Sequence, residues 1–261
     1  MRIRTLIDKE WSEVFKNRMV LMTVLMLPLL FTIMPLIQLA VMRTVDPSKN
    51  SSAPPAILAA CQAQAFSNAE CLQGFMANQF MLFFLLMPLA IPVTIASYSI
   101  VGEKTTRSLE PLLATPTTTS EIILGKALAA AIPAIAATWL SFGLFLIAAR
   151  FLVVSDRVYA LITDPMWLVA MILVAPLMTV MSVNVAIIIS SRVSDPRAAE
   201  QLGMLVMIPL LALFFAQIFG VITLNVTSMF LMALGVLVLD VVLVGAGVKL
   251  FQREAILTHW K

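Results

Sequence analysis

The residues best suited to contact a partner lie in a short polar segment, residues 102–126, between two long apolar runs. It reads GEKTTRSLEPLLATPTTTSEIILGK. Ser108 is placed to cap a short helix, because its side-chain oxygen can accept a hydrogen bond from a backbone N–H two residues on. Pro111 fits the first turn of that helix, and Pro116 ends it by pushing Thr115 away from helical geometry. The spacing therefore predicts a short helix inside the segment.

The predicted short helix is amphipathic. Its leucines and the charged residues around them are Leu109, Leu112, Leu113, Glu103, Lys104, Arg107 and Glu110. A helix of two turns is not stable alone in water, so it has to dock on another surface. Two surfaces stay open, a separate protein or the membrane face of this chain itself. Thr118 and Glu121 then form a capping box that starts the next helix.

Polar side chains inside the apolar runs form a second candidate site. Asp240 lies near the middle of the last run. A charge at that depth costs about 2.5–3.5 kcal/mol, so we expect Asp240 to face other helices or a wet cavity. One role is contact with a substrate, a cation or a proton along a translocation path. The other is a structural hydrogen bond, with Asn184 or Gln217 as the partner, and the sequence leaves both roles open.

Other reaction chemistry is missing from the sequence. The one histidine, His259, lies near the end of the chain, which excludes an H-E-x-x-H zinc site and histidine-based hydrolysis within the bundle. Ser120 and Ala127 stand where the nucleotide-binding pattern G-x-x-x-x-G-K-[ST] requires Gly and then Ser or Thr. Cys61 and Cys71 are too few for a four-ligand zinc site and form either a disulfide or two free thiols. We expect no catalytic residue, metal or cofactor in this chain.

The elements that must position these residues are membrane helices. Of the 261 residues, 61% are hydrophobic and 12% are charged, about half the charged fraction of a soluble domain. Six apolar runs reach the length of about 20 residues that a helix needs to cross a bilayer. They are Met19–Met42, Phe80–Val101, Ala127–Ala149, Met166–Ile189, Leu202–Ile222 and Ser228–Val248. We therefore predict an all-α integral membrane protein, a single domain over residues 1–261, with six transmembrane helices.

Charge and periodicity predict the parts outside the spans. If both termini are cytoplasmic, four of the 17 lysine and arginine residues fall outside, so the positive-inside rule favours that orientation. This bias explains the basic net charge without a nucleic-acid partner. Residues 1–18 have an amphipathic pattern and are expected to lie in the membrane interface rather than to form a solvated helix. Residues 43–79 are predicted to be an extracytoplasmic loop and residues 102–126 a cytoplasmic one.

The polar segment resembles the loop between spans two and three in the type-2 permeases of ATP-binding-cassette transporters. Those loops typically read E-(R/K)-x-x-x-T-L-E-x-L-L-x-(T/S)-P and then E-I-(L/I)-x-G-K. The chain matches at Glu103, Lys104, Leu109, Glu110, Leu112, Leu113, Thr115, Pro116, Glu121, Ile122, Gly125 and Lys126. It departs at Ser108, where Thr is usual, and at the letters TTR, where the family often has a Gly. The amphipathic N-terminus, the six spans and the letters KLFQREAIL extend the likeness over nearly the whole chain.

The resemblance implies the permease subunit of an ATP-driven exporter, which is not an enzyme by itself. It implies that the loop is a coupling helix in a groove of a separate ATPase subunit, and that residues 2–18 are the connecting helix. It also implies a dimer of identical or related permeases, with ATP and magnesium on the ATPases, in a bacterial plasma membrane. The residues assigned to ATPase coupling are Glu103, Lys104, Arg107, Leu109, Glu110, Leu112, Leu113, Thr115 and Pro116.

Two other functions compete with this one. An ion- or proton-coupled secondary transporter could use Asp240, but a single intramembrane charge and no visible internal repeat argue against it. A membrane enzyme or assembly factor is disfavoured by the missing catalytic groups. The apolar interior favours amphipathic drugs, lipids or peptides as substrates, whereas the resemblance also covers exporters of ions and polysaccharides.

Overall fold

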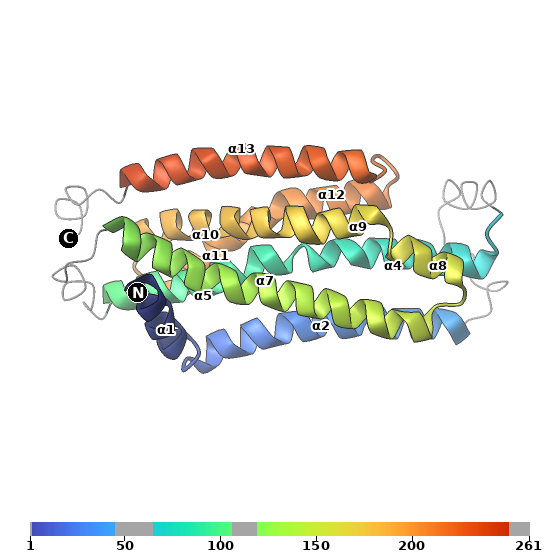
Figure 1. Ribbon diagram of the computed structural model, residues 1–261, viewed down its shortest axis with the longest axis horizontal. Helices are drawn as coiled ribbons and strands as arrows, with labels where there is room; N and C mark the ends of the chain where they lie inside the picture. Colours follow the sequence, from blue (N-terminus) through green and yellow to red (C-terminus); the bar gives the residue numbers. More distant parts are fainter. Residues whose placement is uncertain (1, 45–64, 106–118, 251–261) are drawn as a thin grey trace.

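The computed structural model describes residues 2–44, 65–105 and 119–250, and every regular element in these ranges is a helix. Most helices run along one long axis, whereas α1 (Arg2–Val14) crosses one end of the bundle (Figure 1). Helix α5 ends and helix α7 begins at that same end. We call it the α1 end, and the opposite end the far end.

Six stretches of the described chain are long and apolar enough to cross a membrane, which confirms the predicted all-α fold with six spans. They are Val20–Arg43, Asn68–Thr105, Glu121–Leu152, Asp156–Arg192, Pro196–Ile218 and Val226–Gly247. The protein is therefore a multi-pass membrane protein, because such continuous apolar helices bury their side chains in lipid and satisfy their own backbone groups.

Three of the spans are single helices and three are broken. The single ones are α2 (Arg18–Thr44), α7 (Thr119–Leu152) and α13 (Val226–Leu250). The broken ones consist of α4 (Asn68–Phe84) and α5 (Met87–Thr105); of α8 (Asp156–Ile162), α9 (Pro165–Val169), the π-helix η1 (Ala170–Val174) and α10 (Ala175–Arg192); and of α11 (Pro196–Gly203), the 3-10 helix η2 (Met204–Met207) and α12 (Ile208–Ile218).

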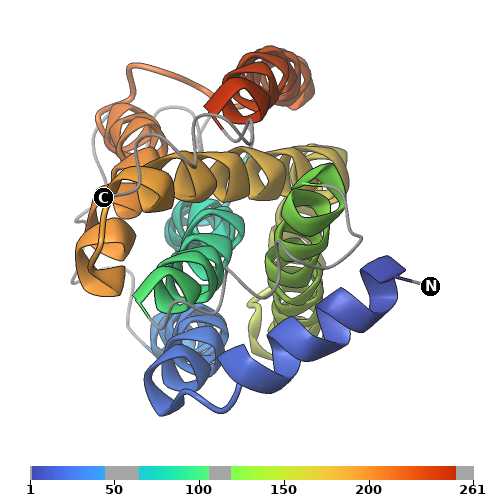
Figure 2. The ribbon, with the colours of Figure 1, turned by 90° about the vertical axis from the view of Figure 1, so that its left-hand side faces the viewer.

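The second span, α4 and α5, occupies the centre of the bundle. Seen from the α1 end, it is surrounded by the other spans (Figure 2). In the most apolar 18 residues of this span, 89% of the residues are buried. The corresponding shares are 17% in the fifth span and 22% in the sixth. Its central side chain Phe84 packs against Phe142 and Phe145 of α7, with ring centroids 5.6 and 5.2 Å apart. The outer spans leave most of their apolar side chains to lipid.

The second span is longer than its apolar run predicts, because polar side chains at its start are satisfied inside the protein. Helix α4 begins after Ser67, which forms a capping box with Glu70. Gln73 is fully buried. Its amide Nε2 donates to the carbonyl oxygens of Leu39 and Leu152, 3.1 and 3.2 Å away. Its Oε1 accepts from the Val154 N–H at 2.7 Å. Part of the segment predicted as the 43–79 loop is thus helix.

Candidate functional site

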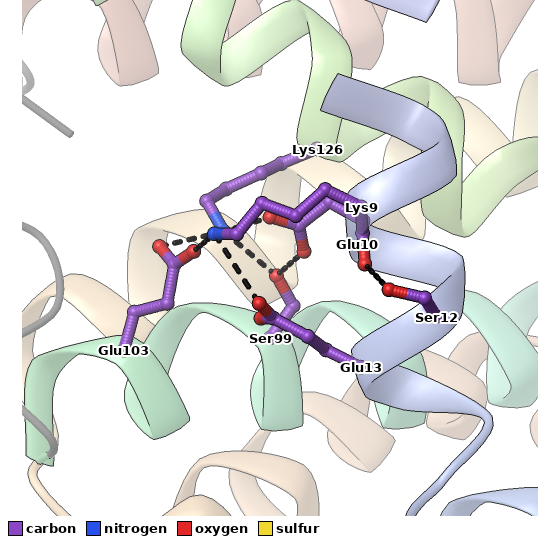
Figure 3. A network of polar contacts seen from close by, with 7 residues as sticks. All are labelled: Lys9, Glu10, Ser12, Glu13, Ser99, Glu103 and Lys126. Atoms are coloured by element: carbon purple, nitrogen blue, oxygen red, sulfur yellow. Dashed lines mark hydrogen bonds and ion pairs between the residues drawn. The ribbon is translucent and has the colours of Figure 1, made fainter. Parts of the chain in front are cut away.

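Charged side chains from three helices meet at the α1 end and form one polar cluster (Figure 3). The members of this cluster are Lys9 and Glu10 of α1, Ser99 and Glu103 of α5, and Lys126 of α7. The three helices are far apart in sequence, so the cluster exists only in the folded chain. It joins the N-terminal helix to the two helices that precede and follow the 106–118 segment.

The ammonium group of Lys126 lies at the centre of the cluster. Its Nζ is 2.7 Å from Glu10 Oε1 and 2.8 Å from Glu103 Oε2. It also donates to Ser99 Oγ at 2.9 Å. The Ser99 hydroxyl in turn donates to the second carboxylate oxygen of Glu10. Three polar partners therefore surround the three ammonium hydrogens, as a buried lysine requires.

Lys9 binds the cluster from its more open side. Its Nζ donates to Glu103 Oε1 at 2.7 Å and lies 3.7 Å from Glu13 of its own helix. Burial lowers the pKa of Lys9, but the hydrogen bond and the charge of Glu103, with two glutamates of α1, outweigh it and raise the pKa above its ordinary value. Lys9 therefore stays charged at neutral pH.

The centre of the cluster is shielded from solvent. The side chains of Glu10, Glu103 and Lys126 are 2%, 5% and 7% exposed. Two lysines face two glutamates there, so the buried charge is balanced. Removing one partner of such a group costs about 3–5 kcal/mol, because the remaining charge is left without compensation. The cluster therefore fixes the relative positions of α1, α5 and α7.

Apolar and backbone contacts hold α1 against α7 beside the cluster. The indole N–H of Trp11 donates to the carbonyl oxygen of Ala129 at 2.9 Å. Leu6 covers Gly125 so closely that a Cβ at Gly125 would lie 2.2 Å from its Cδ2. A side chain at Gly125 would force the Leu6 side chain to move, so glycine permits the close approach of the two helices. Helix α1 is thus docked along the start of α7 (Figure 2).

Two of the nine predicted coupling residues lie within the described ranges, and seven lie outside them. Glu103 belongs to the cluster. Lys104 points elsewhere, and its Nζ donates to the carbonyl oxygens of Ser191 and Val193 at the end of α10, 3.3 Å from each. That contact suits a cation at a helix C-terminus. The residues outside the described ranges are Arg107, Leu109, Glu110, Leu112, Leu113, Thr115 and Pro116.

The described contacts do not join the three intramembrane polar residues. Asn184 donates to the Val180 carbonyl of its own helix at 2.9 Å. Asp240 is 5% exposed on α13, and neither of its carboxylate oxygens has a partner among the described residues. Gln217 lies near the end of α12, and its Oε1 has no partner in the described ranges either. Each of the three is on a different helix.

The described ranges include one of the two cysteines. Cys71 is buried near the start of α4. Cys61 lies outside the described residues. The pairing of Cys61 with Cys71 stays a prediction.

Sequence reasoning missed the partners that make Glu103 part of a cluster. Lys9, Glu10, Ser99 and Lys126 were not assigned to a site, although Lys126 belongs to the family pattern. One signal was available for Glu10. On a helical wheel it lies between Leu6 and Ile3, inside the apolar face of the first helix. A carboxylate on a buried face needs a cation from another element.

The chain matches a known protein family over most of its length. The family described as "ABC-2 family transporter protein" matches residues 4–243. Its match begins in α1 and ends in α13, and so includes the polar cluster, the first five spans and most of the sixth. No curated protein matches the chain.

Proposed function

The chain belongs to the ABC-2 family of transporter proteins and is a multi-pass membrane permease, and from that premise we propose that it couples to a separate ATPase subunit through the segment between α5 and α7. We further propose that two permease copies, identical or related, enclose the transport path. The transporter would export its substrate, with ATP and magnesium bound on the ATPase subunits. The α1 end would face the cytoplasm, where those subunits lie.

The polar cluster is the observation that supports this proposal. Glu103 lies just before the 106–118 segment and Lys126 lies shortly after it, and the two side chains are 2.8 Å apart. Both also bind α1, through Lys9 and Glu10. A partner that moves the 106–118 segment would therefore move α5, α7 and α1 together rather than bend a free loop. Such rigid transmission is what an ATP-driven conformational change requires.

Lys104 extends the same connection to the fourth span. Its hydrogen bonds to the carbonyl oxygens of Ser191 and Val193 tie the end of α5 to the end of α10. Thr94, which lies earlier in α5 than Lys104, donates to Glu200 of α11 at 2.7 Å. The central helix α5 is thus bonded to four neighbours near the α1 end, namely α1, α7, α10 and α11. A displacement at the 106–118 segment would reach the bundle through α5.

Substitutions within the 106–118 segment test the assignment. We expect Leu112→Ala and Glu110→Ala to abolish ATP-driven transport in liposomes, because burial of the leucine and pairing of the neighbouring carboxylate would hold the segment in its groove. The amount of folded permease in the membrane should not change. Thr117→Ala is the matched control in the same segment, and it should transport normally. Full transport by both Leu112→Ala and Glu110→Ala would overturn the coupling assignment.

Co-purification tests the partner itself. A tagged permease taken from its native membrane should bring with it an ATPase that carries the Walker nucleotide-binding loop, and Leu112→Ala should weaken that association by at least about tenfold. Transport that needs an ion gradient, persists without the ATPase and is lost in Asp240→Asn would instead favour a secondary transporter.

A further inference from the structure

Three prolines inside the spans each remove the donor that a carbonyl oxygen would have in a regular helix. Proline has no N–H, so the carbonyl four residues before it loses its hydrogen bond. In α5, Pro92 releases the carbonyl of Pro88, and in α7, Pro133 releases the carbonyl of Ala129. A released carbonyl inside a membrane has to find another donor. At the carbonyls released by Pro92 and Pro133, and at the one described below for Pro176, the donor is a side chain of a neighbouring helix.

Two of these released carbonyls bind Trp11 and Ser182. The indole N–H of Trp11 in α1 donates to the carbonyl oxygen of Ala129 at 2.9 Å. The hydroxyl of Ser182 in α10 lies 2.9 Å from the carbonyl oxygen of Pro88 and 3.0 Å from that of Thr179. A hydroxyl donates one hydrogen. The Pro88 carbonyl is the better acceptor, because Thr179 lies inside a regular stretch of its own helix.

The third case involves the π-helix η1. The N–H of Ala175 donates to the carbonyl of Ala170, five residues back, instead of to Met171. In this register the next carbonyl, that of Met171, would need the N–H of residue 176. Residue 176 is a proline. The indole N–H of Trp139 in α7 donates to the Met171 carbonyl oxygen at 2.8 Å, so a side chain again replaces the missing donor.

A fourth proline shows that a neighbouring helix is not the only solution. Pro209 is the second residue of α12, and its missing N–H would release the carbonyl of Leu205. The chain tightens there into the 3-10 helix η2, and the N–H of Ile208 donates to Leu205 instead. The fifth span therefore satisfies its carbonyl locally. The bonds made by Trp11, Trp139 and Ser182 instead connect one helix to another.

The three bonds connect the helices in series. Trp11 joins α1 to α7, Trp139 joins α7 to the fourth span, and Ser182 joins the fourth span to α5. Helices α5 and α7 are the two that flank the 106–118 segment. We propose that Trp11, Trp139 and Ser182 are positioning residues that couple bending at Pro133, Pro176 and Pro92. This inference rests on the proposed function in one respect: there, the ATPase partner drives the bending by moving the 106–118 segment.

Trp139 is the most informative of the three donors. Its side chain is 47% exposed, so its ring contributes less to packing than a core aromatic residue does. Its hydrogen bond to the Met171 carbonyl is therefore its most specific contact. Trp139→Phe removes the N–H and keeps an aromatic ring. Pro176→Ala supplies a backbone N–H at residue 176, so in that background the Met171 carbonyl no longer depends on Trp139.

Hydrogen exchange of the full-length permease in lipid nanodiscs tests the proposal without transport. In Trp139→Phe we expect amide exchange to rise about fivefold, the factor for one lost hydrogen bond, around Pro176 and also around Pro133 and Pro92. The same substitution in the Pro176→Ala background should leave exchange at all three places near the level of Pro176→Ala alone. Leu140→Phe, at an exposed position one residue away, is the control and should change none of them.

Two results would overturn the proposal. One is a rise confined to η1, which would show that the bond is local. The other is an equal effect of Trp139→Phe in both backgrounds, which would show that the ring rather than the N–H matters. If the assembled transporter is active, transport per ATP hydrolysed should fall about fivefold in Trp139→Phe and recover in the double variant. An inactive transporter with the expected exchange pattern would contradict the proposed function and leave this inference standing.

Discussion

Lys126 has a partner for each of its ammonium hydrogens, the carboxylates of Glu10 and Glu103 and the hydroxyl of Ser99. Because the three charged groups are buried, the methionine variant Lys126→Met would leave two carboxylates beside each other, with Lys9 as the one remaining cation among the described residues. We expect it to lower the free energy of unfolding by about 3–5 kcal/mol, measured by thermal unfolding in detergent. Lys126→Arg keeps the charge and should lose less. A Lys126→Met protein that melts like the unaltered one would show that the cluster contributes no stability.

Asp240 presents the opposite case, a buried carboxylate without a described partner. The helices that pack most closely against α13 are α9, η1 and α10. Their one basic residue is Arg192, the last residue of α10. We expect Asp240→Leu to raise the free energy of unfolding by about 1–3 kcal/mol, because it removes two unpaired oxygens from an apolar contact. Asp240→Asn, which keeps a polar group, is the control. A less stable Asp240→Leu protein would mean that the carboxylate has a partner outside the described residues.

The docking of α1 on α7 depends on close approach at Gly125. We expect Gly125→Ala to destabilise the protein by about 1–3 kcal/mol, because its methyl group would overlap Leu6. Proteolysis within α1 should become faster. Leu6→Ala in the Gly125→Ala background makes room for that methyl group, so the double variant should recover part of the loss. Equal proteolysis of α1 in Gly125→Ala and the unaltered protein would contradict the close contact.

The sequence predicted the spans well and their ends less well. Six apolar runs became six spans, because a run of about 20 apolar residues has few alternatives to a membrane helix. The second span begins earlier than its apolar run predicts. Gln73 can lie inside it because distant groups satisfy its amide. Its three hydrogen bonds come from residues 34 and about 80 positions away. A local pattern carries no information about such partners.

The candidate site was predicted in part for the same reason. The family pattern included Glu103 and Lys126, and their ion pair at the α1 end joins two positions of that pattern. The link to α1 could not be read from the pattern, because Lys9 and Glu10 lie about 100 residues earlier in the chain. The roles of Trp11 and Trp139 depend on which carbonyl a distant proline releases, and this is visible once the helices are placed side by side.

At the scale of the whole molecule, the second span is the element on which the others converge. It is almost entirely buried, whereas the fifth and sixth spans are mostly exposed to lipid. Its polar groups bind residues of α1, α7, α10 and α11, through Glu103, the Pro88 carbonyl and Thr94. A movement of this span therefore reaches nearly every helix of the bundle.

The central position of the second span also bears on how the chain is made. The ribosome delivers the second span before the residues that it needs, since Lys126, Ser182 and Glu200 follow it in the sequence. Until they arrive, Thr94 and the Pro88 carbonyl lack their partners from the later spans, and Glu103 has Lys9 but not Lys126. Unpaired polar groups are costly in lipid. The second span should therefore stay beside the insertion machinery until the start of the fifth span has been synthesised, and a chain that stops after α7 would be a substrate for quality-control proteases.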